Sequence, residues 1–445
     1  MNVDLRNRWQ SYKEAALTAF MPARRHAAGS SLYANSVFLI LNSAAGAALG
    51  FVFWVLAARL YPADAVGSAS AVISVVGLLA FIATLGFGTG LIRFLSLPGT
   101  NKAALINSCL TLSGLVALAG ALVFLARVSV WSPAVQFVRS DLRFALTFVI
   151  FVISTTLVNL LNDTYLAFGR AEYTFTQGLA LGLLKVALIA AFVVAVSIYG
   201  IIAAVAIATA ILALAGMVFF LPRLQPGYRP APGISRHFTG EIFHFSVANY
   251  VGQGLASLPG WLLPVIVLSR LSSQENAHFF IAWSIAAILF SVPNAIANSL
   301  FAECSRDSSR LARDLRRSLV MSVVLGAAAA IIFAAGGNWI LLAFGRQYSS
   351  GGLNLLWLLV PSILPLSVTS LYLAVAKIRK KVGYIIAANG AIAAGTLVPG
   401  YILLPRLGIL APGLAWLVSQ TIVALVVLVP LIRILKNHKA GGLAA

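Results

Sequence analysis

The sequence predicts an all-α polytopic membrane protein with about twelve transmembrane helices, arranged as two parallel-repeat six-helix lobes around a central cleft. The first observation is composition: of 445 residues, 60% are hydrophobic and 9% are charged, whereas about 25% are charged in soluble domains. The second is that the apolar residues form long blocks near the ~20 residues that a helix needs to cross a bilayer. The third is a segment near the start that returns half a chain later.

Twelve apolar blocks have the length of a membrane span. They lie at residues 34–58, 67–92, 103–126, 143–168, 177–197, 199–221, 242–268, 278–302, 318–335, 352–376, 382–404 and 409–432. Only the stretch at 197–200 divides the fifth block from the sixth, so the boundary between these two spans could be drawn differently. The blocks divide the chain into a cytoplasmic N-terminal tail (1–33), an N-lobe of six spans (34–221), a cytoplasmic linker (222–240), a C-lobe of six spans (241–433) and a cytoplasmic C-terminal tail (434–445).

Basic residues predict the orientation of the spans, because Lys and Arg concentrate in cytoplasmic loops. With the N-terminus inside, cytoplasmic segments hold 23 of the 31 Lys and Arg residues. Residues 1–33 lack the apolar core of a cleaved signal peptide, so we expect the first block to stay as a span. Arg127, Arg139 and Arg143 lie outside and go against the rule. The balance predicts cytoplasmic termini, and it explains most of the net charge of +20 as topology signal rather than nucleic-acid binding.

A repeat of about half the chain relates the two lobes. The segment 58–65, which reads ARLYPADA, returns at 269–276 as SRLSSQEN, a shift of 211 residues. In both copies an apolar span ends in a small residue followed by Arg-Leu, and a short turn with one acid leads into the next span. Six spans followed by six of the same orientation form a parallel repeat, as in transporters whose halves rock about an axis normal to the membrane.

The chain lacks the motifs of an enzyme or an ATP-driven pump. The dipeptide Gly-Lys of a P-loop does not occur, and neither does a Gly-x-Ser-x-Gly elbow. The five histidines have no metal-ligand spacing. We therefore expect no enzymatic activity, no cofactor and no metal. The glycines of Gly86–Gly90, Gly46-x3-Gly50 and Gly178-x3-Gly182 are interpreted as sites of helix packing or a local kink.

Ionisable side chains at membrane depth are costly and indicate a cavity or a pathway. Lys185 lies eight residues into the block 177–197, so it either faces substrate or pairs with Asp163 to lock helices together. Asn159, Asn162 and Asp163 share one helix face by their spacing. That face either lines a cavity or caps the helix near water.

Further candidate residues lie at span ends and in the C-lobe. Arg93 ends the second span, and Arg59 and Arg270 hold equivalent repeat positions; each is either a substrate contact or an ordinary interfacial cation. Asn249 and Gln253 are an i, i+4 pair in the seventh span. Apart from Asp163, the intramembrane charge is positive, which favours an anionic substrate such as a phosphate over a drug cation.

Two stretches resemble a known family. Residues 57–67 (AARLYPADAVG) and 85–93 (LGFGTGLIR) resemble the polysaccharide-flippase branch of the multidrug/oligosaccharidyl-lipid/polysaccharide exporter superfamily. The family more often has Gly-Pro where this chain has Tyr61-Pro62. The resemblance implies translocation of a polyprenyl-diphosphate-linked oligosaccharide across the bacterial inner membrane by alternating access. By position it implies that Arg93 contacts phosphate on the inner side and that Arg59 lies at the mouth of the lumen.

The same resemblance implies membrane lipids, a polysaccharide polymerase and other assembly proteins as partners, in the synthesis of exopolysaccharide, O-antigen or capsule. Two other functions stay open. A drug or organic-cation antiporter of the same superfamily requires acids in the N-lobe cavity, where Asp163 is the one candidate. A membrane polysaccharide polymerase or ligase requires a long external loop, and the longest here, residues 126–142, is modest.

Overall fold

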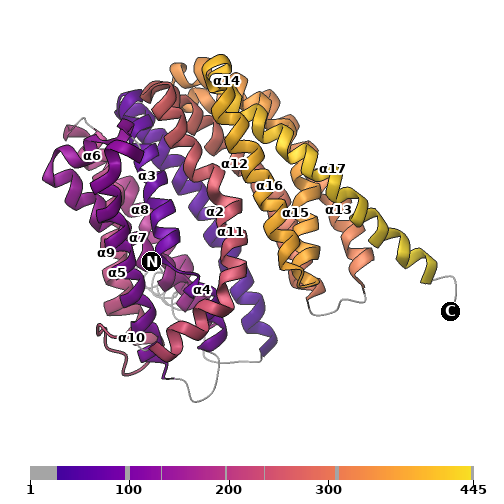
Figure 1. Cartoon of the computed structure of the whole chain (residues 1–445), viewed down its shortest axis with the longest axis horizontal. Helices are drawn as coiled ribbons and strands as arrows, with labels where there is room; N and C mark the ends of the chain where they lie inside the picture. The colour runs from indigo at the N-terminus through magenta and orange to yellow at the C-terminus, as the bar shows by residue number, and fades with distance from the viewer. Residues whose placement is uncertain are drawn as a thin grey trace, which may run out of the picture.

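The computed structural model describes residues 28–95, 101–131, 133–195, 198–234, 236–305 and 310–441, and all regular elements there are helices (Figure 1). The N-lobe comprises α2 (Ala28–Leu60), α3 (Ala63–Ala83), α4 (Phe87–Phe94), α5 (Lys102–Trp131), α6 (Phe137–Ser140), α7 (Leu142–Ala167), α8 (Ala171–Ala191), α9 (Ile198–Ala215) and α10 (Leu221–Leu224). The C-lobe comprises α11 (Arg236–Arg270), α12 (Ser273–Cys304), α13 (Leu311–Phe344), α14 (Arg346–Leu359), α15 (Ile363–Ile378), α16 (Val382–Leu407) and α17 (Leu410–Gly441).

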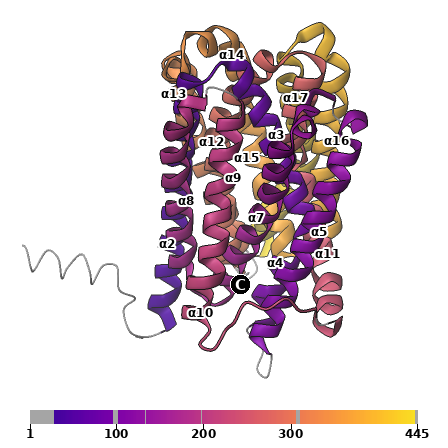
Figure 2. The ribbon, with the colours of Figure 1, turned by 90° about the vertical axis from the view of Figure 1, so that its left-hand side faces the viewer.

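Twelve segments of the described chain are long and apolar enough to cross a membrane, as the sequence predicts. They run back and forth between two ends of the bundle (Figures 1 and 2). We call the end that holds the α2–α3 turn the Tyr61 end, and the end that holds the α7–α8 turn the Arg170 end. The all-helical architecture and the number of spans are therefore confirmed, and the chain is a multi-pass membrane protein.

The second predicted span, 67–92, is broken in the structure. Helix α3 ends at Ala83, and α4 begins only at Phe87. Leu85 and Gly86 both have a positive φ, of 52° and 72°, a conformation that costs a non-glycine residue energy and interrupts a helix. The hydroxyl of Tyr250 donates to the carbonyl oxygen of Phe81 at 2.6 Å, so a carbonyl group at this helix end has a partner. The kink expected at Gly86–Gly90 is present.

The fifth span lies six residues earlier than predicted, at Ala171–Ala191 rather than 177–197. The short helix Phe192–Ala195 follows it, and α9 starts at Ile198. Polar residues such as Glu172 and Gln177 lie within the first two turns of α8. A span predicted from a run of apolar residues therefore begins after most of these two turns. The shift matters because it changes the depth of Lys185.

Helix ends keep the register of the repeat. Helix α8 begins at Ala171 and α16 at Val382, and α7 ends at Ala167 and α15 at Ile378, so both pairs differ by 211 residues. Helices α2 and α11 end 210 residues apart, at Leu60 and Arg270. The correspondence therefore reaches the fourth and fifth spans of each lobe and is not limited to the motif after the first span.

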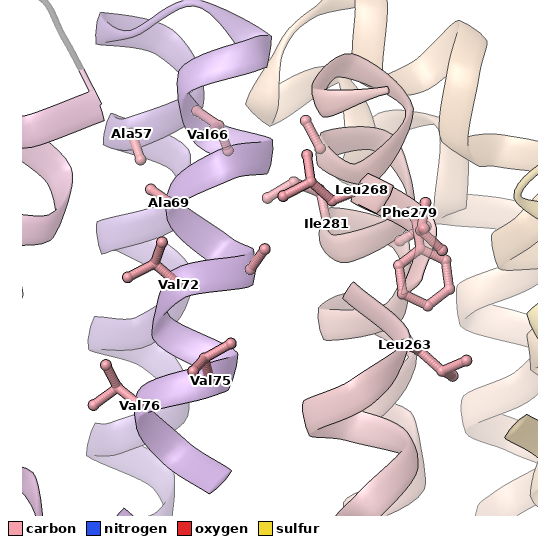
Figure 3. Packing of buried hydrophobic residues seen from close by; sticks show 14 of the residues in the cluster. Ala57, Val66, Ala69, Val72, Val75, Val76, Leu263, Leu268, Phe279 and Ile281 are labelled. Carbon is pink, nitrogen blue, oxygen red and sulfur yellow. The ribbon is translucent and has the colours of Figure 1, made fainter. Parts of the chain in front are cut away.

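Buried apolar side chains form three clusters whose distribution separates the two ends of the bundle. The largest cluster runs through both lobes and joins residues of α3, such as Val72, to residues of α11 and α12, such as Leu263 and Phe279 (Figure 3). The second, which includes Leu91 and Leu160, belongs to the N-lobe alone, and the third, which includes Leu300, belongs to the C-lobe alone. The lobes thus share a core toward the Tyr61 end and have separate cores toward the Arg170 end.

The segment between the lobes is fastened to the N-lobe. The hydroxyl of Tyr228 donates to Oδ1 of Asn107 in α5 at 2.6 Å, and Nδ2 of the same amide donates to the carbonyl oxygen of Arg229 at 3.0 Å. Tyr228 is buried, and desolvation raises the pKa of its phenol to about 12. Residues 225–234, within the predicted linker 222–240, are irregular.

Candidate functional site

Asparagine and glycine residues build the contact between α2 and α8, which lie side by side in Figure 2. Asn35 accepts the backbone N–H of Ala171 at 3.1 Å. Seven residues later, Asn42 lies so close to Gly178 that a side chain there would overlap its amide. Gly182 meets Leu49 in the same way. The prediction that Gly178 and Gly182 serve helix packing is confirmed, whereas Gly46 and Gly50 have nothing within 4 Å of an added Cβ and serve no such contact.

Lys185 lies on the same side of α8, with its ammonium 5.8 Å from the ring centroid of Phe53. Lys185 follows the start of α8 by 14 residues, about 21 Å along the axis, and precedes its end by six, about 9 Å. Its side chain is half-buried. Lys185 lies nearer the Tyr61 end than the predicted span implies.

The alternative that Lys185 pairs with Asp163 is wrong. Asp163 precedes the end of α7 by four residues, about 6 Å from the Arg170 end. The two side chains are therefore separated by roughly 15 Å along the bundle, because Lys185 is about 21 Å from that same end. The ion pair of the described residues joins Arg170 and Glu172, and neither Lys185 nor Asp163 takes part in it. The ammonium of Lys185 contacts the ring of Phe53, and it forms no ion pair with a carboxylate of the described residues.

Asp163 belongs to a polar group on α7 near the break between α3 and α4. Its carboxylate lies against Gly88, where a side-chain carbon would overlap it. Asn162 accepts from Nε2 of Gln177 at 3.4 Å, and the hydroxyl of Tyr165 donates to Oε1 of Gln177 at 2.9 Å. Asn159, one turn earlier in α7, is exposed in the described structure. Asn162 and Asp163 therefore do not merely cap the helix end in water.

Gln177 and Tyr165 were missed by sequence reasoning. Both are fully buried, and both lie within 3.1 Å of the position that a Cβ on Gly216 would occupy. Gly216 begins a π-helical turn, Gly216–Phe220, of a kind that often accompanies functional sites. The one available signal was a glutamine early in an apolar helix, and the predicted span began at that residue without assigning it a role.

Arg59 and Arg270 occupy equivalent repeat positions but make different contacts. The guanidinium of Arg59 donates from Nε to the carbonyl oxygen of Ala343 at 2.8 Å and from Nη2 to that of Leu342 at 2.6 Å. It thus connects the end of α2 to the C-terminus of α13 in the other lobe. Arg270 stays within its own lobe and stacks over the ring of Tyr401, 4.2 Å from the centroid. Arg59 therefore has a contact between the lobes, whereas Arg270 has a contact within one lobe.

Buried amides of α12 add to the connection between the lobes at the Tyr61 end. Nδ2 of Asn276 donates to the carbonyl oxygen of Gly67 in α3 at 2.7 Å. Ser68 donates to Ser273 at 3.0 Å across the same contact. Gly67 has no room for a side chain, because one would overlap the backbone of Ser273. These contacts hold α3 and α12 together where the shared core lies.

The remaining predicted residues are Arg93, Gln253 and Asn249. Arg93 is exposed at the end of α4, with its guanidinium 5.8 Å from the ring centroid of Phe94. Gln253 is exposed on α11. Asn249 is also on α11, but its side chain lies outside the described residues.

In the C-lobe the asparagine that joins the first and fifth spans lies on the fifth span, α16, and not on the first. Asn389 of α16 occupies the position of Gly178 in the repeat, since 178 and 389 differ by 211. Its Nδ2 donates to the carbonyl oxygen of Gly252 in α11 at 2.9 Å. The first and fifth spans of both lobes are thus joined through an asparagine, which lies on the first span (α2) in the N-lobe and on the fifth (α16) in the C-lobe. The repeat position of Asn42 itself is held by Gln253.

No protein-family model and no curated protein matches the sequence. Solved structures do match. The chain is similar to a structure described as the lipid II flippase MurJ in an inward closed conformation, with a TM-score of 0.70 and 13% identity over 89% of this chain and 90% of that one. It is also similar to an inward-facing multidrug resistance MATE family transporter of the MOP superfamily, with a TM-score of 0.67 and 12% identity over 89% and 99% of the two chains.

A third similar structure is a MOP superfamily transporter from Pyrococcus furiosus, with a TM-score of 0.62 and 12% identity over 91% of this chain and 95% of that one. That transporter is described as having a binding pocket of reverse polarity, which suggests a different function for it. At such identities these likenesses concern the fold. This chain has the twelve-helix fold of MATE transporters and of the MurJ flippase.

Proposed function

We propose that this chain translocates a polyprenyl-diphosphate-linked oligosaccharide across the cytoplasmic membrane by alternating access, in the synthesis of a cell-surface polysaccharide. The observation that carries the proposal is Lys185, a cation within a span whose contact is the ring of Phe53 and not an acid. A cation without a carboxylate partner in a low-dielectric region attracts phosphate.

The distribution of the core supports alternating access. A core shared toward the Tyr61 end and separate cores toward the Arg170 end are what a transporter open at one end requires. We further propose that the Arg170 end faces the cytoplasm, because Lys and Arg favour that side and the exposed Arg313, Arg316, Arg317 and Arg379 lie there.

The proposed substrate contacts follow from this orientation. Arg93 at the end of α4 receives the diphosphate at the cytoplasmic end, and Asn159, Gln253 and Asn249 offer amides for sugar hydroxyls. Asp163 completes the polar lining of the N-lobe, and Lys185 holds the anion deeper in the membrane. Arg59 and Arg270 act last, since Arg59 is bound to α13 while the Tyr61 end is closed.

A drug-cation antiporter is the second candidate function. The observation in its favour is Asp163, an acid of the N-lobe that lies against Gly88 within the span region. Buried carboxylates bind organic cations as readily as a buried lysine binds phosphate. Two of the similar structures are described as multidrug resistance MATE family transporters, whereas MurJ is described as a lipid II flippase.

One experiment separates the two candidates. A strain without the protein is complemented with wild type, Lys185→Arg, Lys185→Gln or Asp163→Asn, at matched membrane abundance. The proposal expects loss of surface polysaccharide and accumulation of lipid-linked intermediate in the deletion strain and with Lys185→Gln, and restoration with Lys185→Arg. Normal polysaccharide in the deletion strain, together with ethidium resistance that depends on Asp163, would establish the antiporter instead.

A further inference from the structure

A groove of about 1060 Å³ lies between α13 and α17 at the Arg170 end. Its volume reaches the upper limit of the roughly 300–1,000 Å³ typical of ligand pockets. All of its lining residues come from the C-lobe. A transported substrate of an alternating-access protein lies between the two lobes, so this groove is not part of the path between them.

One face of α13 gives the groove its charge. Arg313, Arg316 and Arg317 line it in the first two turns of the helix, and all three guanidinium groups are exposed. The nearby acid on the same helix, Asp314, contacts the thiol of buried Cys304 at 3.9 Å and does not line the groove. Three arginines in one concave site are a strong receptor for a phosphate group, which accepts several charge-assisted hydrogen bonds.

The same face becomes apolar deeper in the membrane. Val320, Met321, Val324 and Leu325 continue the lining at helical spacing, each between 45% and 59% exposed. Ile432 and Leu435 of α17 close the opposite side. From Arg313 to Leu325 the helix rises about 18 Å, close to the ~15 Å of one hydrocarbon leaflet. The arginines at one end of the groove match the phosphate of a phospholipid, and the apolar part has a length that matches an acyl chain of a single leaflet.

The arginines are particular to the C-lobe. A shift of 211 residues places Arg316 and Arg317 on Leu105 and Ile106 of α5, both of which are fully buried. Only Arg313 has a basic counterpart, Lys102. A signal for membrane orientation alone needs charge in the loop, but it needs neither a groove nor an apolar continuation.

We propose that this groove is a binding site for an anionic phospholipid of the cytoplasmic leaflet. Its phosphate contacts Arg313, Arg316 and Arg317, and one acyl chain lies along Val320, Val324 and Leu325. The site is independent of the transported substrate, because its walls belong to one lobe. The chemistry selects an anionic headgroup over a zwitterionic one, since α13 supplies cations at the groove and no carboxylate.

Native mass spectrometry of the purified full-length protein tests the proposal, with equal amounts of phosphatidylglycerol and phosphatidylcholine added. We expect the wild type to retain phosphatidylglycerol preferentially. The variant Arg313→Gln/Arg316→Gln/Arg317→Gln should bind it about ten-fold more weakly. A matched control, Lys377→Gln/Arg379→Gln/Lys380→Gln, removes the same charge from three exposed cations of the same lobe at the same end and should bind like wild type.

Val324→Trp tests the apolar part separately, because it fills this part of the groove without changing the charge. We expect weaker phosphatidylglycerol binding in this variant, even if the triple arginine variant does not fold. The proposal would be overturned by equal losses in the two triple variants, by unchanged binding in Val324→Trp, or by a polyprenyl diphosphate that occupies the groove while phosphatidylglycerol does not.

Discussion

The carboxylate of Asp163 lies directly against the backbone of Gly88, where the second predicted span is broken. A methyl group at Gly88 would overlap the carboxylate, so the acid and the glycine depend on each other. This contact links the polar group of α7 to the short helix that ends in Arg93. Any movement of α4 must therefore move the surroundings of Asp163.

We predict that Gly88→Ala lowers the free energy of unfolding by about 1–3 kcal/mol, as overpacking does. The second substitution Asp163→Ala should recover most of the loss, because it removes the overlapping atoms. Gly114→Ala, where an added Cβ meets nothing within 4 Å, is the control. The thermal midpoint of the detergent-purified protein is the measurement, and additive losses in the double variant would disprove the contact.

Packing of α2 on α8 gives a second prediction. Gly178→Leu should destabilise the protein strongly, because the new side chain meets the amide of Asn42. Gly46→Leu, in the first-span glycine pair that has open space around it, should be nearly neutral. Folded yield by fluorescence-detected gel filtration distinguishes them. If the two variants behaved alike, close packing at Gly178 would be refuted.

Arg59 should control the equilibrium between conformations. Arg59→Gln removes two hydrogen bonds from a charged donor to α13, each worth about 1.5–3 kcal/mol. We expect a shift toward states open at the Tyr61 end, detected as longer distances between spin labels on the α2–α3 turn and the α13–α14 turn. Arg270→Gln, whose contact lies within one lobe, should leave those distances unchanged. A shift of equal size in both variants would argue against a specific role.

The raised pKa of Tyr228 predicts that the free energy of unfolding falls at alkaline pH. Its pKa is raised in the folded state, to about 12 from the ordinary value of 10.0. The folded protein therefore binds more protons than the unfolded chain between these values. The contribution to stability is complete below pH 10 and is lost as the pH rises toward 12. Tyr228→Phe should lose about 1 kcal/mol of stability at pH 8.

The same variant should then show a smaller additional loss between pH 9 and pH 11, about one pH unit on either side of the ordinary tyrosine pKa. The comparison uses thermal midpoints of wild type and variant at the two pH values. An identical pH dependence in both proteins would show that the Tyr228 phenol is not responsible.

Most of the fold follows from the sequence, because the length of an apolar block and the cost of burying polar backbone in lipid leave few alternatives to spanning helices. The register of the repeat follows from one short motif at 58–65, and the helix ends at Ala171 and Val382 keep it. The broken second span is less predictable. Its glycines indicated a kink, but no residue pattern marks the positive φ of Leu85, and the partner of the Phe81 carbonyl group, Tyr250, comes from the other lobe.

The candidate site is less predictable than the fold, because it depends on which helices face each other. Sequence spacing groups Asn159, Asn162 and Asp163 on one face, but it cannot reveal Gly88 as their neighbour. The depth of Lys185 was misjudged because most of the first two turns of α8 were excluded from the span. Arg59 and Arg270 are equivalent by motif, yet their contacts differ, since only tertiary structure brings the end of α13 to Arg59.

The asparagine that joins the first and fifth spans lies on the first span in one lobe and on the fifth in the other, so the two halves are not interchangeable. A chimera that combined α2 with α16 would set Asn42 against Asn389, two amides where the packing has room for one. The opposite chimera, α11 with α8, would leave the carbonyl oxygen of Gly252 without the amide of Asn389. If the halves arose by gene duplication, each helix pair has since changed in step with its partner, and neither half can now serve as a template for the other.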